Sequence, residues 1–268
     1  MTSGAGDKTG VWPIWRDAIS RFRLVWTLGI IVTALFMVTG LGMGFLYGEL
    51  AGTEVLGPQA RVEWAWDDFL FNWLTWVLHY LAYAIVLARL MSLQDAATDE
   101  SLPSVRFIWA CLPVFMLLAL PSSMVSTWMP NATFTVRHAL MMAPQSLLDA
   151  TLSLVGLRWA IGLWLGRHRA ALHPDWKELP FRVAAKLVLG LTFLLASAEM
   201  AYAGLGEIHW QVLTGSYNLA VVMRAATWCA AFSALYLNVV MTPSLMVAWY
   251  RNLPSVKTQT AGVRTIFS

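Results

Sequence analysis

The chain has 268 residues, of which 58% are hydrophobic and only 12% are charged. An ordinary soluble domain carries about 25% charged residues. The chain therefore has too much apolar surface for a fold that faces water, and we expect it to lie in a lipid bilayer. The net charge of +3 does not indicate a nucleic-acid partner, because the basic residues stand at the ends of apolar runs, where anionic lipid headgroups account for them.

The first residues, 1–11, are small and polar, and we expect them to be disordered. No signal-peptide pattern follows them, so the first apolar run is expected to remain as a span. Apolar residues then recur every three or four positions, while polar and basic residues fill the other face, which is typical of a helix lying in the membrane interface. The apolar residues are Trp12, Trp15, Ile19, Phe22 and Trp26, and the polar residues are Arg16, Asp17, Ser20, Arg21 and Arg23. We interpret the segment as an anchor for the first span, with membrane sensing or partner docking as the alternative.

Six apolar runs are long enough to cross about 30 Å of hydrocarbon. They are residues 24–47, 69–91, 105–128, 147–166, 183–205 and 217 to about 250. The segments 49–68, 129–146 and 206–216 are expected to be external. The sequence thus predicts an all-α, polytopic membrane protein, with one six-span helical bundle over residues 12–250 and a cytoplasmic tail over 251–268.

The connector 167–182 sets the orientation, because it is rich in Lys and Arg and such loops stay on the cytoplasmic side. Of the 18 Lys and Arg residues, all but Arg61, Arg137 and Arg224 fall on or toward the same side as this connector. Both termini are therefore predicted to be cytoplasmic.

Three glycines at four-residue spacing, Gly40, Gly44 and Gly48, share one face of the first span. Helix backbones can approach closely at such a face. We interpret it as packing inside the chain, and a homo- or hetero-oligomer seam is the alternative.

Familiar catalytic patterns are missing: the sequence has no His-Glu-x-x-His, Cys-x-x-Cys, nucleophile elbow or phosphate-cradling glycine loop. The sequence therefore favours a non-enzymatic role. Candidate functional residues are the ionisable side chains inside the spans, since each is costly in lipid unless paired or hydrated. They are His79, Asp149, Arg158, Glu199 and Arg224.

His79 lies near the middle of the second span, where an imidazole could ligate haem or a chlorophyll-type pigment. A second histidine in the middle of a span, as bis-histidine ligation of haem requires, is missing from the sequence. The alternative is a hydrogen-bonded packing histidine. No metal site is predicted, and Cys111 and Cys229 are expected to be packing residues within apolar runs.

The fourth span carries a stripe of small and polar residues, Asp149, Ser153, Gly156 and Ala160, which should face other helices. Arg158 lies nine residues after Asp149 and so on the opposite face. We expect it to reach partly toward the inner headgroups, and a substrate-binding arginine is the alternative.

Glu199 and Arg224 each lie seven residues from the short turn predicted between the last two spans. Their depths agree at the usual rise of a helix. We predict that they form a buried pair that pins this hairpin, with a proton or substrate relay as the alternative.

The lead-in Trp15-Arg16-Asp17-Ala18-Ile19-Ser20-Arg21-Phe22-Arg23, followed by six spans with a basic connector after the fourth, resembles the bacterial YciC-like membrane proteins. The layout is also similar to the membrane domain attached to some glycerophosphodiester phosphodiesterases, whose catalytic domain is absent from this chain. The resemblance implies a bacterial inner-membrane protein and assigns no site residue.

The leading functional hypothesis is a non-enzymatic structural or accessory protein whose partners are membrane lipids. A transporter of a small molecule or lipid is the first alternative. The second is an accessory subunit of a larger membrane complex that binds lipid or pigment.

Overall fold

The computed structural model describes residues 11–51, 66–93, 104–128, 136–165, 182–196 and 217–253. These residues form six helices, so the all-α prediction is confirmed for this part of the chain. They are α1 (Val11–Ala51), α2 (Trp66–Ser92), α3 (Ser104–Trp128), α4 (Val136–Trp164), a helix over 182–196, and α7 (Tyr217–Arg251).

Five of the helices contain a stretch long and apolar enough to cross a membrane, which is the pattern of a multi-pass membrane protein. The stretches are Val11–Thr39, Phe69–Ser92, Val105–Thr127, Ala143–Trp164 and Phe232–Arg251. They overlap five of the six predicted spans. The remaining predicted span, 183–205, is described only over 182–196.

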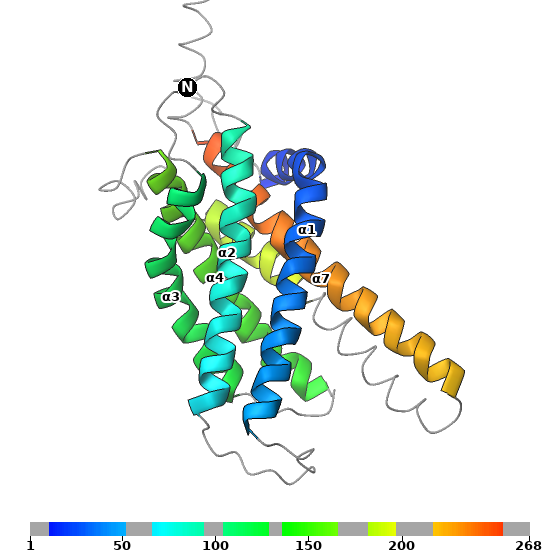
Figure 1. Ribbon diagram of the computed structural model, residues 1–268. Helices are drawn as coiled ribbons and strands as arrows, with labels where there is room; N and C mark the ends of the chain where they lie inside the picture. The colour runs from blue at the N-terminus through cyan, green and yellow to red at the C-terminus, as the bar shows by residue number, and fades with distance from the viewer. Residues whose placement is uncertain are drawn as a thin grey trace, which may run out of the picture.

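Helix α2 is the centre of the bundle, because it contacts α1, α3, α4 and α7 (Figure 1). Its second half is buried on nearly every side, from Val77 to Met91. A helix that is apolar all round belongs in the interior of a bundle. Two side chains with polar groups on this half of α2, His79 and Tyr83, consequently lie in the core.

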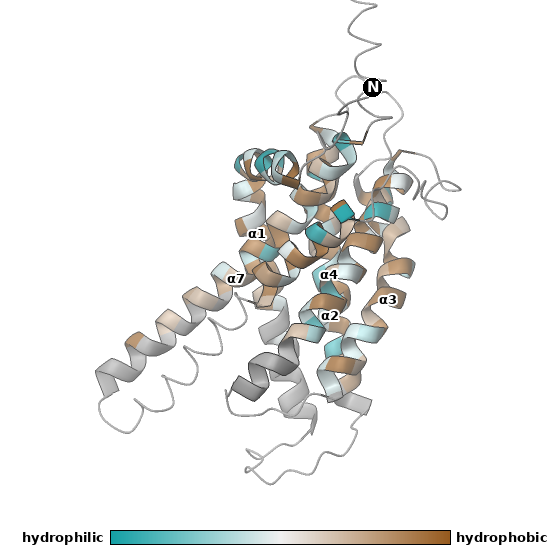
Figure 2. Ribbon diagram, turned by 180° about the vertical axis from the view of Figure 1, so that it is seen from behind, coloured by the Kyte–Doolittle hydropathy of each residue, from teal (hydrophilic) through white to brown (hydrophobic). Residues whose placement is uncertain are grey.

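Helices α1 and α3 lie at the periphery and expose most of their apolar stretches, whereas α2, α4 and α7 bury more than half of theirs. Leu35 on α1 and Trp109 on α3 are 62% and 68% exposed. Figure 2 shows hydrophobic residues along the outer sides of the bundle and hydrophilic ones at one end and on the inner helices. Exposed faces of this composition suit contact with lipid.

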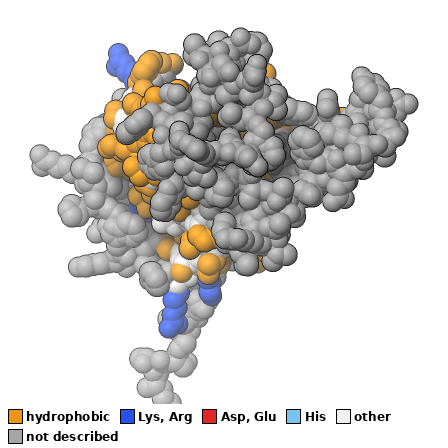
Figure 3. All heavy atoms as spheres, turned by 90° about the horizontal axis from the view of Figure 1, so that it is seen from below, with side chains coloured by type: hydrophobic (Ala, Val, Ile, Leu, Met, Phe, Trp, Pro, Cys, Tyr) orange, Lys and Arg blue, Asp and Glu red, His pale blue; other side chains and the backbone are white. Residues whose placement is uncertain are grey.

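Exposed basic residues lie at helix ends that meet at one end of the bundle, the upper end in Figure 1. Arg23 follows the first turns of α1, Arg89 ends α2, and Arg106 begins α3. Lys186 begins the helix 182–196, and Arg251 ends α7. In the view from the opposite end, most atoms belong to residues that are not described, and the described side chains in sight are hydrophobic with Lys or Arg at the edges (Figure 3). The described helix ends thus carry their basic residues at one side of the bundle.

The interfacial helix and the first span form one unbroken helix, α1, rather than two elements. Its first turns, dark blue in Figure 1, run at an angle to the rest. Among the predicted apolar residues, Trp12, Ile19 and Trp26 face outward and are more than half exposed, in line with contact with lipid.

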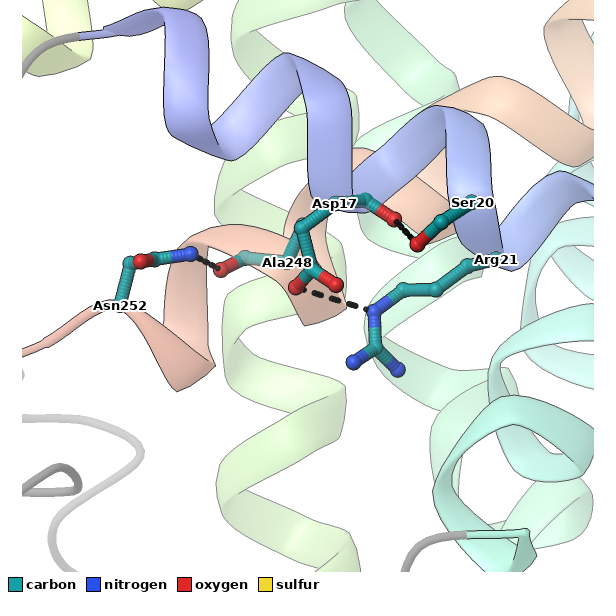
Figure 4. Close-up of polar contacts among 5 residues, drawn as sticks. All are labelled: Asp17, Ser20, Arg21, Ala248 and Asn252. Atoms are coloured by element: carbon teal, nitrogen blue, oxygen red, sulfur yellow. Dashed lines mark hydrogen bonds and ion pairs between the residues drawn. The ribbon is translucent and has the colours of Figure 1, made fainter.

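Arg21 differs from the expectation that it would lie on the polar outer face, since it is 4% exposed. The face that packs on the bundle is Ile14, Ala18, Arg21 and Val25, which are three or four residues apart and therefore adjacent on a helix. Asp17 compensates the buried charge through an ion pair with Arg21 at 3.2 Å, beside the last turns of α7 (Figure 4).

The fourth span starts earlier than predicted: the segment 129–146 was expected to be external, but α4 begins at Val136 and its apolar stretch begins at Ala143, before Pro144. Gln145 and Ser146 suggested a loop in the sequence, yet both are buried. Gln145 Nε2 donates to Ser126 Oγ of α3 at 2.9 Å. A polar side chain is tolerated in a span when a neighbouring helix supplies its partner.

Candidate functional site

Four polar side chains of α2 and α7 meet in the core, and we call them the His79 set: His79, Tyr83, Asn238 and Thr242. The Tyr83 hydroxyl donates to Asn238 Oδ1 at 2.6 Å, and Thr242 Oγ1 donates to the same oxygen at 2.9 Å. His79 Nε2 lies 2.7 Å from Tyr83 Oη and 3.0 Å from Asn238 Nδ2. The set therefore joins two helices through a closed triangle of hydrogen-bonding groups.

Helical spacing explains why these residues meet. His79 and Tyr83 are four apart on α2, and Asn238 and Thr242 are four apart on α7, so each pair shares a face of its helix. The two helices contact each other, and their polar faces lie against one another at this contact. In an apolar interior, such side chains are stabilised by bonding to one another across the helices.

The triangle can hold a proton on either nitrogen of the His79 ring. A neutral imidazole has one nitrogen that donates and one that accepts. With hydrogen on Nδ1, Nε2 accepts from the Asn238 amide; with hydrogen on Nε2, it donates to Tyr83 Oη. Either tautomer thus fits the triangle, so Nε2 of His79 can donate or accept while the set holds the helices together.

Aromatic rings enclose the His79 ring. The ring centroids of Phe36 and Trp76 lie 5.5 Å from that of His79, and the Tyr83 ring lies edge-on at 4.6 Å. Ligation of a haem or pigment through Nε2 would break the contacts with Tyr83 and Asn238. Cofactor binding by His79 stays a prediction, and this geometry favours its hydrogen-bonding role.

A second group of polar side chains surrounds Asp149, and we call it the Asp149 set: Tyr80, Ser122, Asp149 and Ser153. It draws on α2, α3 and α4. Ser122 Oγ donates to Asp149 Oδ1 at 2.6 Å. The Tyr80 hydroxyl lies beside Ser122 and Ser153, but within the described part of the chain no group meets the distance and angle of a hydrogen bond with it.

Tyr83 connects the two sets. It belongs to the His79 set, and it also lies within electrostatic range of Asp149 and beside Ser153. Polar groups thus run through the core from α7 across α2 to α3 and α4. The burial is nearly complete, with Asp149 4% and Tyr80 0% exposed.

The predicted stripe on α4 is confirmed as an inward face. Asp149, Ser153, Gly156 and Ala160 are all buried. A side chain at Gly156 would meet Leu118 and Phe115 of α3. Small residues at this face let α3 and α4 approach closely, which brings Ser122 to Asp149.

Arg158 is half-buried and its guanidinium lies 5.5 Å from the centre of the Trp249 ring, in a cation–π arrangement. Neither a substrate role nor contact with headgroups is tested by this contact. Glu199 and the side chain of Arg224 lie outside the described residues, so their pairing stays a prediction. The surroundings of Gly40, Gly44 and Gly48 likewise lie outside the description, although all three residues belong to α1.

Sequence reasoning identified His79 and Asp149 but not the partners that make them a site. The missed residues are Tyr80, Tyr83, Ser122, Asn238 and Thr242. A usable signal was present, because His79 with Tyr83 and Asn238 with Thr242 are polar pairs at four-residue spacing inside apolar runs. In the part of the chain that the structure describes, no cluster of His, Cys, Asp or Glu could hold a metal ion.

Comparison with protein-family models, curated proteins and solved structures finds no match for this chain. The functional argument therefore starts from the two polar sets.

Proposed function

We propose that the protein is a bacterial inner-membrane transporter of a small polar solute or lipid, with six spans and both termini in the cytoplasm. The observation that carries this proposal is the group of buried and half-buried polar side chains formed by the His79 and Asp149 sets, which meet at Tyr83. Ionisable side chains inside a membrane bundle are costly and are typically found on substrate, ion or proton pathways.

Buried hydroxyls without a partner add support. Among the described residues, the side-chain oxygens of Thr33, Tyr80, Ser146 and Ser244 are buried and form no hydrogen bond within the protein. Buried polar groups are normally satisfied by protein or by ordered water. Access of water to the core would satisfy these groups, and a transport pathway provides such access.

The orientation in this proposal is supported by the exposed basic residues at one end of the bundle. Lys and Arg are enriched on the cytoplasmic side of membrane proteins. The assignment to the bacterial inner membrane rests on the resemblance to YciC-like proteins.

A structural role is the competing explanation, since the His79 set also joins α2 to α7. The two roles differ in whether water reaches the core. We would replace Cys111 and Cys229 by alanine, introduce Ser153→Cys, and treat the protein in membranes with a hydrophilic thiol reagent from each side in turn. A transporter should allow modification of Ser153→Cys from at least one side.

Two positions serve as controls for this labelling. Val86, fully buried among apolar side chains, should be unreactive as Val86→Cys. Leu93, 41% exposed after the end of α2, should react readily as Leu93→Cys. If Ser153→Cys is as unreactive as Val86→Cys from both sides, the core is closed to water and the transport proposal is wrong.

A further inference from the structure

Asp149 carries a carboxyl group in the middle of the bundle with little to balance a negative charge. Ser122 Oγ is the donor that the structure gives it, at 2.6 Å. The ion pair between Arg21 and Asp17 lies in the first turns of α1. Arg158 is nine residues from Asp149, on the opposite face of α4, with its guanidinium over Trp249.

The groups that face Asp149 from the packed helices are mostly hydroxyls. Helix α3 contributes Ser122, and α2 contributes Tyr80 and Tyr83, which titrate only in alkaline solution when free in water. His79 does not face Asp149 directly, and the two are connected through Tyr83, whose Oη lies 2.7 Å from His79 Nε2. Helix α7 contributes Thr242 next to Tyr83, which does not titrate. None of these neighbours brings a full positive charge to the carboxyl group while His79 is neutral.

Tyr80 gives a second, independent indication of a binding site. Its ring is fixed by stacking on Phe115, with centroids 5.5 Å apart and planes 17° apart. Its hydroxyl is fully buried next to the Asp149 set, yet forms no hydrogen bond with the described residues. A buried hydroxyl left without a partner is costly, so a ligand that supplies a partner is favoured here.

An ionised carboxylate held by hydroxyl groups in an apolar interior is far more costly than a neutral carboxylic acid. Binding one proton converts the carboxylate to the acid, removes the charge and creates an O–H donor. The Tyr80 oxygen, which has no hydrogen-bond partner among the described residues and lies within electrostatic range of Asp149, can accept from such a donor. The site therefore suits a proton without needing the several oxygen ligands that a metal cation requires.

We propose that Asp149, which accepts from Ser122 and lies within electrostatic range of Tyr80, is a proton-binding site in the core of the bundle. Proton binding at Asp149 does not depend on transport. Its use as the coupling ion of transport rests on the proposed function, with the proton passing between Asp149 and the His79 set by way of Tyr83. The ligand class is a single proton, not a metal ion or an organic cation.

Infrared spectroscopy of the purified full chain at neutral pH tests the proposal directly, because the carbonyl stretch of a carboxylic acid is resolved from the bands of a carboxylate. We expect a protonated-carboxyl band in the unsubstituted protein and its loss in Asp149→Asn. The matched control is Asp17→Asn, which removes a carboxylate paired with Arg21 and should leave the band unchanged.

A second measurement keeps the proposal testable if Asp149→Asn does not fold. Unsubstituted protein grown with aspartate that carries heavy carbon in its side-chain carboxyl group should show the band shifted to lower frequency, and Asp149→Glu should show it at the unshifted frequency under the same labelling. A labelled protein without any shifted carboxylic-acid band overturns the proposal.

A sodium ion is the chemical alternative for a lone carboxylate among hydroxyls. If sodium chloride raises the melting temperature above that in choline chloride, and Asp149→Asn abolishes this difference, the carboxylate is ionised and the proton site is disproved. Failure of Ser153→Cys to react, together with a protonated Asp149, would reject transport while leaving the proton site intact. Reaction of Ser153→Cys with no carboxylic-acid band would do the reverse.

Discussion

Asn238 is the residue that most directly links α7 to α2, since it accepts from both Tyr83 and Thr242 and lies 3.0 Å from His79. Replacing it with leucine leaves these polar groups without their partner in an apolar core. Each buried group left unsatisfied costs about 1–3 kcal/mol. We therefore expect Asn238→Leu to lower the unfolding free energy by at least that amount, measured by denaturation in detergent.

A double-mutant cycle with Tyr83→Phe separates this effect from a general loss of packing. The double variant should lose clearly less stability than the sum of the single losses, because it removes both ends of one hydrogen bond. Thr75→Val is the matched control, since the Thr75 hydroxyl donates to Phe71 O of its own helix at 2.9 Å. Strictly additive losses would mean that the Tyr83 to Asn238 contact contributes nothing.

For single residues, the sequence predicted those positions whose relevant neighbours lie on the same helix. The stripe of Asp149, Ser153, Gly156 and Ala160 followed from helical spacing, and its inward direction is confirmed. Asn238 could not be assigned to His79 in the same way, because 159 residues separate the two. No local pattern states which two polar faces meet across a bundle.

Gly29 decides how closely α1 approaches α7. A Cβ placed there would overlap Val240 Cγ2 and would lie 2.9 Å from Tyr236 Cε2. Added volume in a packed interface forces side chains or backbone to shift, at a cost of about 1–3 kcal/mol. Gly29→Ala should accordingly lower the unfolding free energy, and Val240→Ala in the same chain should recover part of the loss.

Gly42 provides the control on the same helix, since nothing lies within 4 Å of a Cβ built there. Gly42→Ala should be neutral or stabilising by up to about 1 kcal/mol, because alanine favours helix over glycine. Equal changes in stability for Gly29→Ala and Gly42→Ala would show that close packing against α7 does not decide the result.

The hairpin between the last two predicted spans carries the predicted pair of Glu199 and Arg224. Breaking one partner of a buried ion pair costs about 3–5 kcal/mol, because the other charge is left uncompensated. Glu199→Gln and Arg224→Gln should each destabilise the protein, and the double variant should recover much of the loss. Additive losses in the thermal stability of the detergent-solubilised protein would mean that the side chains do not meet.

Element boundaries were predictable where apolar runs met charged residues and were wrong where polar residues turned inward. The second and third spans, expected at 69–91 and 105–128, agree with the apolar stretches of α2 and α3 within a residue or two. Helix α4 begins at Val136, eleven residues before the predicted start of the fourth span at Leu147, and the burial of Gln145 depends on Ser126 of another helix. Hydropathy alone counts such a residue as loop.

For the molecule as a whole, composition and hydropathy sufficed to predict an all-helical, multi-pass architecture. They did not show that α2 is the central helix or that α1 packs against α7. These relations depend on which faces fit together, and the decisive close contacts involve single residues such as Gly29 and Gly156. The His79 and Asp149 sets form because these helix faces pack together, and the sequence therefore did not predict them either.

Orientation in the membrane is the remaining property of the whole chain, and the positions of the basic residues predict it. Arg89, Arg106 and Arg251 are exposed at helix ends that meet at one end of the bundle, and Arg23 is exposed in the first third of α1. Retaining such residues on the cytoplasmic side is favoured during insertion. The predicted connector 167–182 is itself rich in Lys and Arg, and all of it except Arg182 lies outside the described residues. It should therefore face the cytoplasm together with Met1 and Ser268.

Labelling of intact cells tests this orientation in a background without Cys111 and Cys229. A cysteine at Thr53 should react with a membrane-impermeant thiol reagent added outside, whereas one at Ala171 should react only after the membrane is opened. Each variant is its own control, because opening the membrane exposes both sides. External labelling of Ala171→Cys with protection of Thr53→Cys would reverse the topology, and the exposed basic residues would then lie on the outer side against the usual charge preference.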